Sequence, residues 1–113
     1  MTSQFDRPVT LSGSTTRVRT AHGNLYVTVN YQDGKPVEVF AALGKAGGCD
    51  FAAMEAITRL VSISLQQGIP IEEIVKQLRS ITCHPYMVGS EQENTSPVDA
   101  ISRVLESSSK PKT

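Results

Sequence analysis

Two cysteines, and a histidine beside one of them, are the side chains of this sequence best suited to bind a metal ion. Cys83 and His84 are adjacent, and Cys49 stands nearer the N-terminus. Thiolate sulfur and imidazole nitrogen are the usual ligands of zinc in proteins. The sequence therefore predicts a candidate zinc site formed by Cys49, Cys83 and His84. Adjacent ligands are less common than a Cys-x-x-Cys pair, and a fourth ligand, His22 or Asp99, would be a guess.

Gly47 and Gly48 come directly before Cys49, at the expected start of a long helix. Free backbone N–H groups and the helix dipole can bind an anion or activate a thiol at such a terminus. The alternative is a tight turn from strand to helix, in which Cys49 packs inward as a small apolar residue. The sequence leaves both interpretations open, but it excludes a Walker phosphate loop, because the spacing and the Lys-Ser/Thr ending are missing.

No group of residues in the sequence indicates catalysis. His22 belongs to His22-Gly23-Asn24, a hairpin turn that is expected to leave the imidazole facing solvent. A nucleophilic pair of Cys83 and His84 is disfavoured, because neighbouring side chains usually diverge. A redox pair of Cys49 and Cys83 lacks the usual Cys-x-x-Cys spacing. We therefore assign no catalytic residue.

The composition predicts one small domain. The chain has 113 residues, with 11 Lys and Arg against 11 Asp and Glu, and no Trp. A clustered basic face is absent, which argues against nucleic acid as a partner. No run of ~18 apolar residues would span a membrane, and the N-terminus lacks the pattern of a signal peptide. A cytoplasmic protein with reduced thiols is the expectation.

The residue periodicity predicts an α+β fold, a three-stranded antiparallel meander followed by three helices. Period-two alternation favours strands at about 14–20, 24–31 and 36–43. A long helix follows and should pack on the sheet through an apolar side, leaving its polar residues outside. That side holds Ala53, Ile57, Leu60, Val61, Ser64 and Leu65, and the outside holds Glu55, Arg59, Ser62 and Gln66.

Two shorter helices should complete the domain. Ile71, Ile74, Val75 and Leu78 mark the first of them, and Ser96 should cap the second, with Pro97 at its first position and Asp99 reaching back as in a capping box. We expect an irregular lead-in at 1–13, a single domain at 14–106 and a disordered tail at 107–113. The sheet would have two edges, and a homodimer is one way to cover them.

Several stretches of the sequence resemble the TSCPD domain, which occurs near the C-terminus of adenosylcobalamin-dependent (class II) ribonucleotide reductases and in small stand-alone proteins. The resemblance runs from about Arg7 to Leu105. It is carried by Gly23-Asn24-Leu25-Tyr26-Val27-Thr28-Val29, Glu38-Val39-Phe40, Leu43-Gly44-Lys45-Ala46-Gly47-Gly48-Cys49, Glu55-Ala56-Ile57-Thr58-Arg59-Leu60-Val61-Ser62 and Glu72-Glu73-Ile74-Val75-Lys76-Gln77-Leu78-Arg79-Ser80-Ile81-Thr82-Cys83.

One departure from the family affects the candidate metal site. The Thr-Ser-Cys-Pro-Asp signature reads Thr95-Ser96-Pro97-Val98-Asp99 here, so its cysteine is absent. Members with three cysteines suggest a shared metal or redox site, of which this chain keeps Cys49 and Cys83. Zinc would then depend on His84 as a substitute.

The resemblance implies a part in deoxyribonucleotide synthesis without the reaction itself. The catalytic barrel and the cobalamin site of the reductases lie outside the matching region. The implied role is that of an accessory or C-terminal domain that partners the catalytic subunit, through which alone adenosylcobalamin would be involved. The alternatives are a small metal- or anion-binding protein on the same fold, or an interaction module whose cysteines are core residues.

Overall fold

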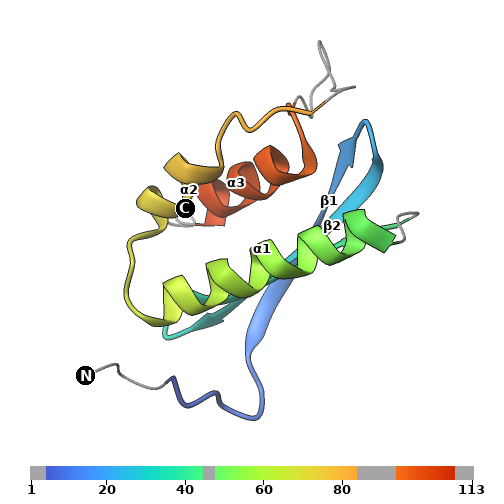
Figure 1. Cartoon of the computed structure of the whole chain (residues 1–113). Coiled ribbons are helices and arrows are strands. Elements are labelled where there is room, and N and C mark those ends of the chain that lie inside the picture. The colour runs from blue at the N-terminus through green and yellow to red at the C-terminus, as the bar shows by residue number, and fades with distance from the viewer. Residues whose placement is uncertain (1–4, 45–47, 84–93, 109–113) are drawn as a thin grey trace.

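The computed structural model describes residues 5–44, 48–83 and 94–108 of the chain (Figure 1). In this part of the chain the order of elements is β1 (Ser12–Thr20), β2 (Gly23–Gln32), β3 (Lys35–Leu43), α1 (Gly48–Gln66), α2 (Ile71–Leu78) and α3 (Pro97–Ser108). The α+β fold with a meander and three helices is therefore confirmed, with strands slightly longer than predicted. The proposed domain limits, 14–106, stay a prediction.

The three strands form one antiparallel sheet in the order β1-β2-β3. Asp33 and Gly34 connect β2 to β3 with φ angles of 53° and 78°. Positive φ at both central residues is what a two-residue hairpin turn of the favoured hand requires, and Asp-Gly supplies it. The Asp-Gly signal in the sequence is thus confirmed as a turn.

The helices all cover the same face of the sheet (Figure 1). α1 runs along β3, whereas α3 lies over β1 and β2 and packs against α2. The core lies between these two layers, because alternate residues of each strand point toward the helices. Its members are Leu25, Val27, Val29, Val39, Leu43, Met54, Val61, Ile74, Val75, Ala100, Ile101, Val104 and Leu105.

The orientation predicted for α1 is wrong by part of a turn. Met54, Thr58 and Val61 are its buried residues, whereas Leu60, which was expected inside, is 68% exposed. Ser62 and Gln66, which were expected outside, turn toward β3 instead. Apolar residues occur on two sides of this helix, so spacing alone could not choose between them. The hydrogen-bonding demand of the β3 backbone decides the orientation.

None of the described helices covers the other face of the sheet. Tyr26 and Phe40 are 40% and 53% exposed there. Glu38 lies on the same face but is 7% exposed, because Arg7 and Asn30 cover it. Arg7 donates to both carboxylate oxygens of Glu38, at 2.6 and 3.2 Å, and so ties the segment before β1 to β3.

None of the described helices is both long and apolar enough to cross a membrane.

Candidate functional site

Three segments that are distant in the sequence meet at one end of the molecule: the β1–β2 hairpin, the residues after α2, and the start of α3 (Figure 1). His22 Nε2 lies 3.0 Å from Cys83 Sγ, and both side chains are half-buried. The prediction that His22 faces solvent is therefore wrong. The turn was recognisable from the sequence, but its neighbour belongs to a segment 61 residues away.

The hairpin end is fixed by its own hydrogen bonds. The hydroxyl of Thr20 accepts a bond from the His22 N–H at 3.1 Å and donates to the Gly23 carbonyl at 2.7 Å. Gly23 has a φ of 107°, a conformation that a residue with a Cβ rarely adopts. The turn therefore holds the backbone of His22 in place and directs its ring toward Cys83.

The segment that carries Cys83 is held by the buried carboxylate of Asp99. One oxygen accepts from the Ser80 N–H at 2.7 Å, and the other accepts from the Thr95 N–H at 3.0 Å and from Arg103 Nε at 2.8 Å. Burial acts to raise the pKa of Asp99, but these hydrogen bonds outweigh it and hold the pKa below its usual value. Asp99 thus joins the end of α2 to the start of α3.

Of the cap predicted for α3, the part made by Ser96 is confirmed and the part made by the Asp99 side chain is wrong. Ser96 Oγ accepts the Asp99 N–H at 3.0 Å, as an N-cap residue does. The Asp99 carboxylate, however, binds the N–H groups of Thr95 and Ser80, whereas a capping box would have it bind the cap residue itself. The Cys83 N–H also donates to the Thr95 carbonyl, at 2.9 Å, so the cap and the thiol share one network.

A pocket of about 200 Å³ opens beside the thiol. Burial raises the pKa of Cys83, and the nearby charge of Asp50 raises it further. The thiol consequently keeps its proton at neutral pH and can donate it to an imidazole nitrogen, or it can bind a soft metal ion together with that nitrogen. The lining residues are His22, Leu43, Asp50, Ala53, Met54, Ile81, Thr82, Cys83, Ser96, Pro97 and Val98.

The predicted metal ligands are only partly placed by the structure. Cys49 is exposed and does not line the pocket, so the interpretation that it packs inward is wrong. Gly48 opens α1 with a φ of 60°, whereas Gly47 and His84 lie outside the described residues. Among the described residues no three His, Cys, Asp or Glu side chains gather closely enough to hold a metal ion. The set of Cys49, Cys83 and His84 therefore stays a prediction.

The fold and this pocket define a small α+β domain with a thiol–imidazole pair between its hairpin and its last helix. Residues 1–109 match the TSCPD domain, and the chain belongs to that family. It is also similar to a protein of Rhodopirellula baltica described as a vitamin B12-dependent ribonucleotide reductase, at 32% identity over 78 residues. These residues are 66% of this chain and 8% of that protein. No solved structure matches the chain.

The family signature falls on the pocket. Thr95, Ser96 and Asp99 keep their signature identities and make the hydrogen bonds described above, whereas Pro97 occupies the place of the signature cysteine. Pro97 and Cys83 line the same pocket. Two signature positions differ here, since Val98 also replaces the signature proline, and the replaced cysteine would have lined the same pocket as Cys83.

Proposed function

We propose that the chain is an accessory domain that docks on the catalytic part of an adenosylcobalamin-dependent ribonucleotide reductase and has no catalytic activity alone. The observation that carries the proposal is the family membership over residues 1–109, together with the similarity to a protein described as a vitamin B12-dependent ribonucleotide reductase. The chain spans about 8% of that relative's length, which supports a role beside the reaction machinery.

A surface of α1 that is left uncovered supports a docking role. Leu60 is 68% exposed, Ile63 53% and Ile69 45%, and they lie along α1 and just after it. Exposed apolar side chains that gather on one element are more typical of a binding surface than of ordinary surface variation. The proposed partner is therefore a protein surface, and the proposed process is deoxyribonucleotide synthesis in the cytoplasm. Two free cysteines agree with a reducing compartment.

Reconstitution tests the proposal. A cobalamin-dependent reductase that lacks its own TSCPD region is mixed with the chain, and co-elution and deoxynucleotide formation are measured together. We expect a complex and raised turnover, and Leu60→Lys should weaken the complex at least about tenfold, because it places a charge on the exposed apolar surface. Ala42→Lys is the matched control, since Ala42 is also exposed but lies on the face of the sheet that carries no helix. No complex at micromolar concentrations contradicts the proposal.

A metal-binding role is the second candidate, and the contact between His22 and Cys83 favours it. Neutral imidazole and thiolate are zinc ligands, and Cys49 and His84 would complete the set. The chain is loaded with zinc under reducing, anaerobic conditions, and bound metal is measured by elemental analysis. Stoichiometric zinc that is lost in Cys83→Ala and in His22→Ala, but kept in Asp33→Asn, would support this role. A chain that keeps no zinc would contradict it.

A further inference from the structure

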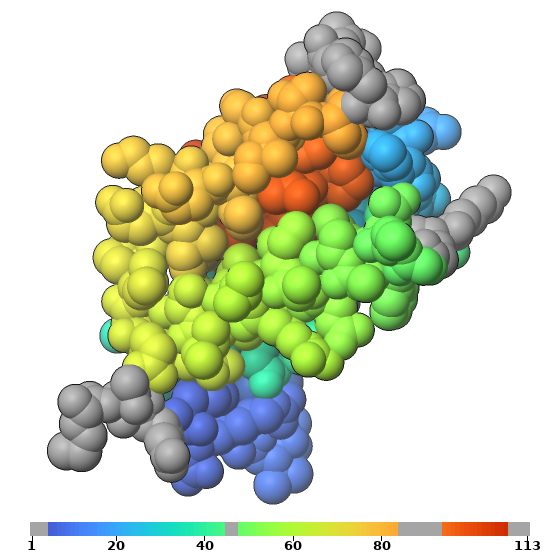
Figure 2. Space-filling view, viewed as in Figure 1, coloured from blue at the N-terminus to red at the C-terminus, as the bar shows by residue number. Residues whose placement is uncertain are grey.

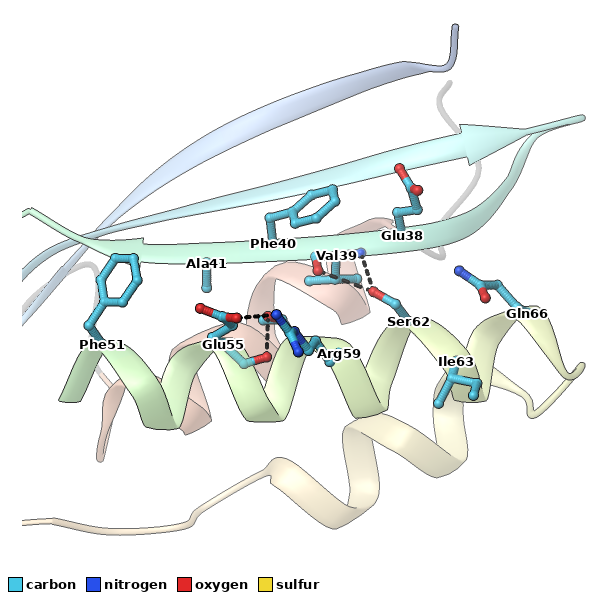
Figure 3. Close-up of a pocket in the computed structure, with 11 residues that line it drawn as sticks. Glu38, Val39, Phe40, Ala41, Phe51, Glu55, Arg59, Ser62, Ile63 and Gln66 are labelled. Carbon is cyan, nitrogen blue, oxygen red and sulfur yellow. Dashed lines mark hydrogen bonds and ion pairs between the residues drawn. The ribbon is translucent and has the colours of Figure 1, made fainter. Parts of the chain in front are cut away.

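The two edges of the sheet are treated differently by the rest of the molecule. At β3 the Val39 N–H donates to Ser62 Oγ at 2.9 Å, and Ser62 Oγ donates back to the Val39 carbonyl at 3.2 Å. Gln66 Nε2 donates to the Val37 carbonyl at 3.1 Å. Figure 3 shows both side chains directed from α1 toward β3. Three main-chain groups at the middle of this edge, the N–H and carbonyl of Val39 and the carbonyl of Val37, therefore have partners in α1.

The direction of the backbone groups in β1 follows from one hydrogen bond. The Gly44 N–H donates to the Asn24 carbonyl at 2.9 Å, so the main-chain groups of Asn24 point toward β3. Directions alternate along a strand, so those of Leu25 point toward β1 and pair with Val18. Continuing the alternation, the main-chain groups of every odd-numbered residue of β1 point away from the sheet. Arg19 agrees, because its carbonyl accepts a bond from Asn94 Nδ2 at 2.9 Å.

The remaining outward groups of β1 belong to Gly13, Thr15 and Arg17. All three residues are exposed, and no described residue donates to or accepts from these main-chain groups. Figure 1 shows the first half of β1 extending beyond the helices, and Figure 2 shows the segment before β1 together with the start of β1 projecting at the lower end of the molecule. The segment before β1 does not cover the edge, since Arg7 holds it against Glu38 of β3.

We propose that this edge pairs with β1 of a second copy, antiparallel and centred on Thr15, to form one continuous six-stranded sheet. The register places Thr15 opposite Thr15 and Gly13 opposite Arg17 of the second copy. Each of these three pairs joins residues whose main-chain groups point outward, so about six hydrogen bonds can form. A row of unpaired backbone groups that is neither twisted away nor covered is the usual template for such an association.

The side chains of the edge are self-complementary in this register. Thr15 already hydrogen-bonds to Thr28 inside one copy, Oγ1 to Oγ1 at 2.7 Å, and Thr pairs across strands are favourable. The two Arg17 side chains stand four residues apart along the paired strands, which is about 14 Å. That separation exceeds the Debye length of about 8 Å at physiological salt, so their repulsion is screened. Opposite each Arg17 stands Gly13, which has no side chain of its own, and Asn30 Oδ1 of the same copy fills the place where a Cβ of Gly13 would be.

Sedimentation equilibrium of the whole chain tests the proposal with three variants. Thr15→Pro removes an outward N–H without touching the bonds between β1 and β2. Thr15→Lys places two charges face to face at the centre of the interface. Thr28→Lys is the matched control, because Thr28 is the neighbour of Thr15 on the same face but belongs to the central strand. We expect a dimer whose association constant falls at least tenfold in both Thr15 variants and less than threefold in Thr28→Lys.

Crosslinking keeps the test decisive if a Thr15 variant fails to fold. Thr15→Cys is placed in a chain with Cys49→Ser and Cys83→Ser, and mild oxidation should give a covalent dimer, whereas Thr28→Cys should not. A wild-type chain that stays monomeric at millimolar concentration overturns the proposal. A dimer that Thr28→Lys dissociates and Thr15→Pro leaves intact also overturns it, because the open face would then be the interface. None of these measurements involves a reductase, so they are independent of the proposed function.

Discussion

The Cys83 thiol sits in a half-buried pocket against His22, and its surroundings disfavour the thiolate. Burial raises the pKa of Cys83, and the charge of Asp50 adds to this effect. Cys49 is exposed at the start of α1. Because the thiolate is the reactive form, the two cysteines should differ sharply toward an alkylating reagent even though both are free.

The rate of alkylation measures this difference directly. Cys49→Ser leaves only Cys83, and Cys83→Ser leaves only Cys49, so each variant reports on one thiol. With iodoacetamide at pH 8 we expect Cys83 to react more slowly than Cys49, since the pocket shields its sulfur and its raised pKa lowers the fraction of thiolate. In urea the two rates should converge. Equal rates in the folded proteins would show that the pocket does not protect Cys83.

Residue identity alone could propose the cysteines but not their partners. The sequence singled out Cys83 because a histidine stands beside it, and its role as a metal ligand stays a prediction. It paired Cys83 with the adjacent His84, whereas the described contact comes from His22 in a distant turn. Sequence proximity is a poor guide here, because the fold brings the hairpin and the start of α3 together. Asp99 was likewise recognised as a helix-start residue without its bond to Ser80.

The elements themselves were largely predictable, since each has a strong local signal. Strand alternation, the Asp-Gly turn and the Ser-Pro helix start all reappear in the structure. The orientation of α1 was not predictable, because Ser62 and Gln66 read as solvent-facing residues until β3 is placed beside them. The side chains of Ser62 and Gln66 form hydrogen bonds with backbone groups of β3 at the edge of the sheet (Figure 3).

Ser62→Ala tests the importance of that contact. The change removes both hydrogen bonds to Val39 and leaves a half-buried N–H and carbonyl without their partner, which should cost about 1–3 kcal/mol of unfolding free energy. Ser64→Ala is the control on the same helix, because its hydroxyl bonds only to the Leu60 carbonyl of α1. It should change stability by less than about 0.5 kcal/mol.

Urea denaturation measures both variants, and amide exchange of Val39 reports the edge directly. Protection of the Val39 N–H should fall in Ser62→Ala and stay unchanged in Ser64→Ala. Equal stability of the two variants would mean that water replaces the serine hydroxyl at the edge without loss.

At the scale of the molecule, two carboxylates of the described residues have lowered pKa values, and they lie in separate places. Asp99 lies in the helical layer, and Glu38 lies on the face of the sheet that carries no helix. The hydrogen bond from Arg7 lowers the pKa of Glu38 against the opposing effect of burial, and Asn30 adds to the lowering. The pKa of Asp99 is also lowered. A carboxylate with a depressed pKa in the folded state stabilises the fold above its unfolded pKa of about 4, and this contribution is lost as the pH falls through the folded value.

The melting temperature of the wild-type chain should therefore stay nearly level from pH 7 to about 5 and fall steeply below pH 4. Asp99→Asn removes a negative charge that accepts three hydrogen bonds. The change should lower the free energy of unfolding at pH 7 by about 1–3 kcal/mol and the melting temperature by several degrees. Glu38→Gln should have a smaller effect, because Arg7 is largely exposed to solvent. Both variants should lose less stability than the wild type between pH 5 and 3, because the Asn or Gln side chain, unlike the carboxylate that it replaces, takes up no proton in this range.

Additivity distinguishes two independent contacts from one coupled network. The described hydrogen bonds of Asp99 and Glu38 share no residue, so the double variant should lose the sum of the two single losses within about 0.5 kcal/mol. Among the wild type, the two single variants and the double variant, the double variant should lose the least stability between pH 5 and 3. If the double variant keeps the steep fall of the wild type below pH 4, the acid sensitivity comes from other carboxylates. A marked departure from additivity would instead mean that the contacts of Asp99 in the helical layer and those of Glu38 on the uncovered face are energetically coupled.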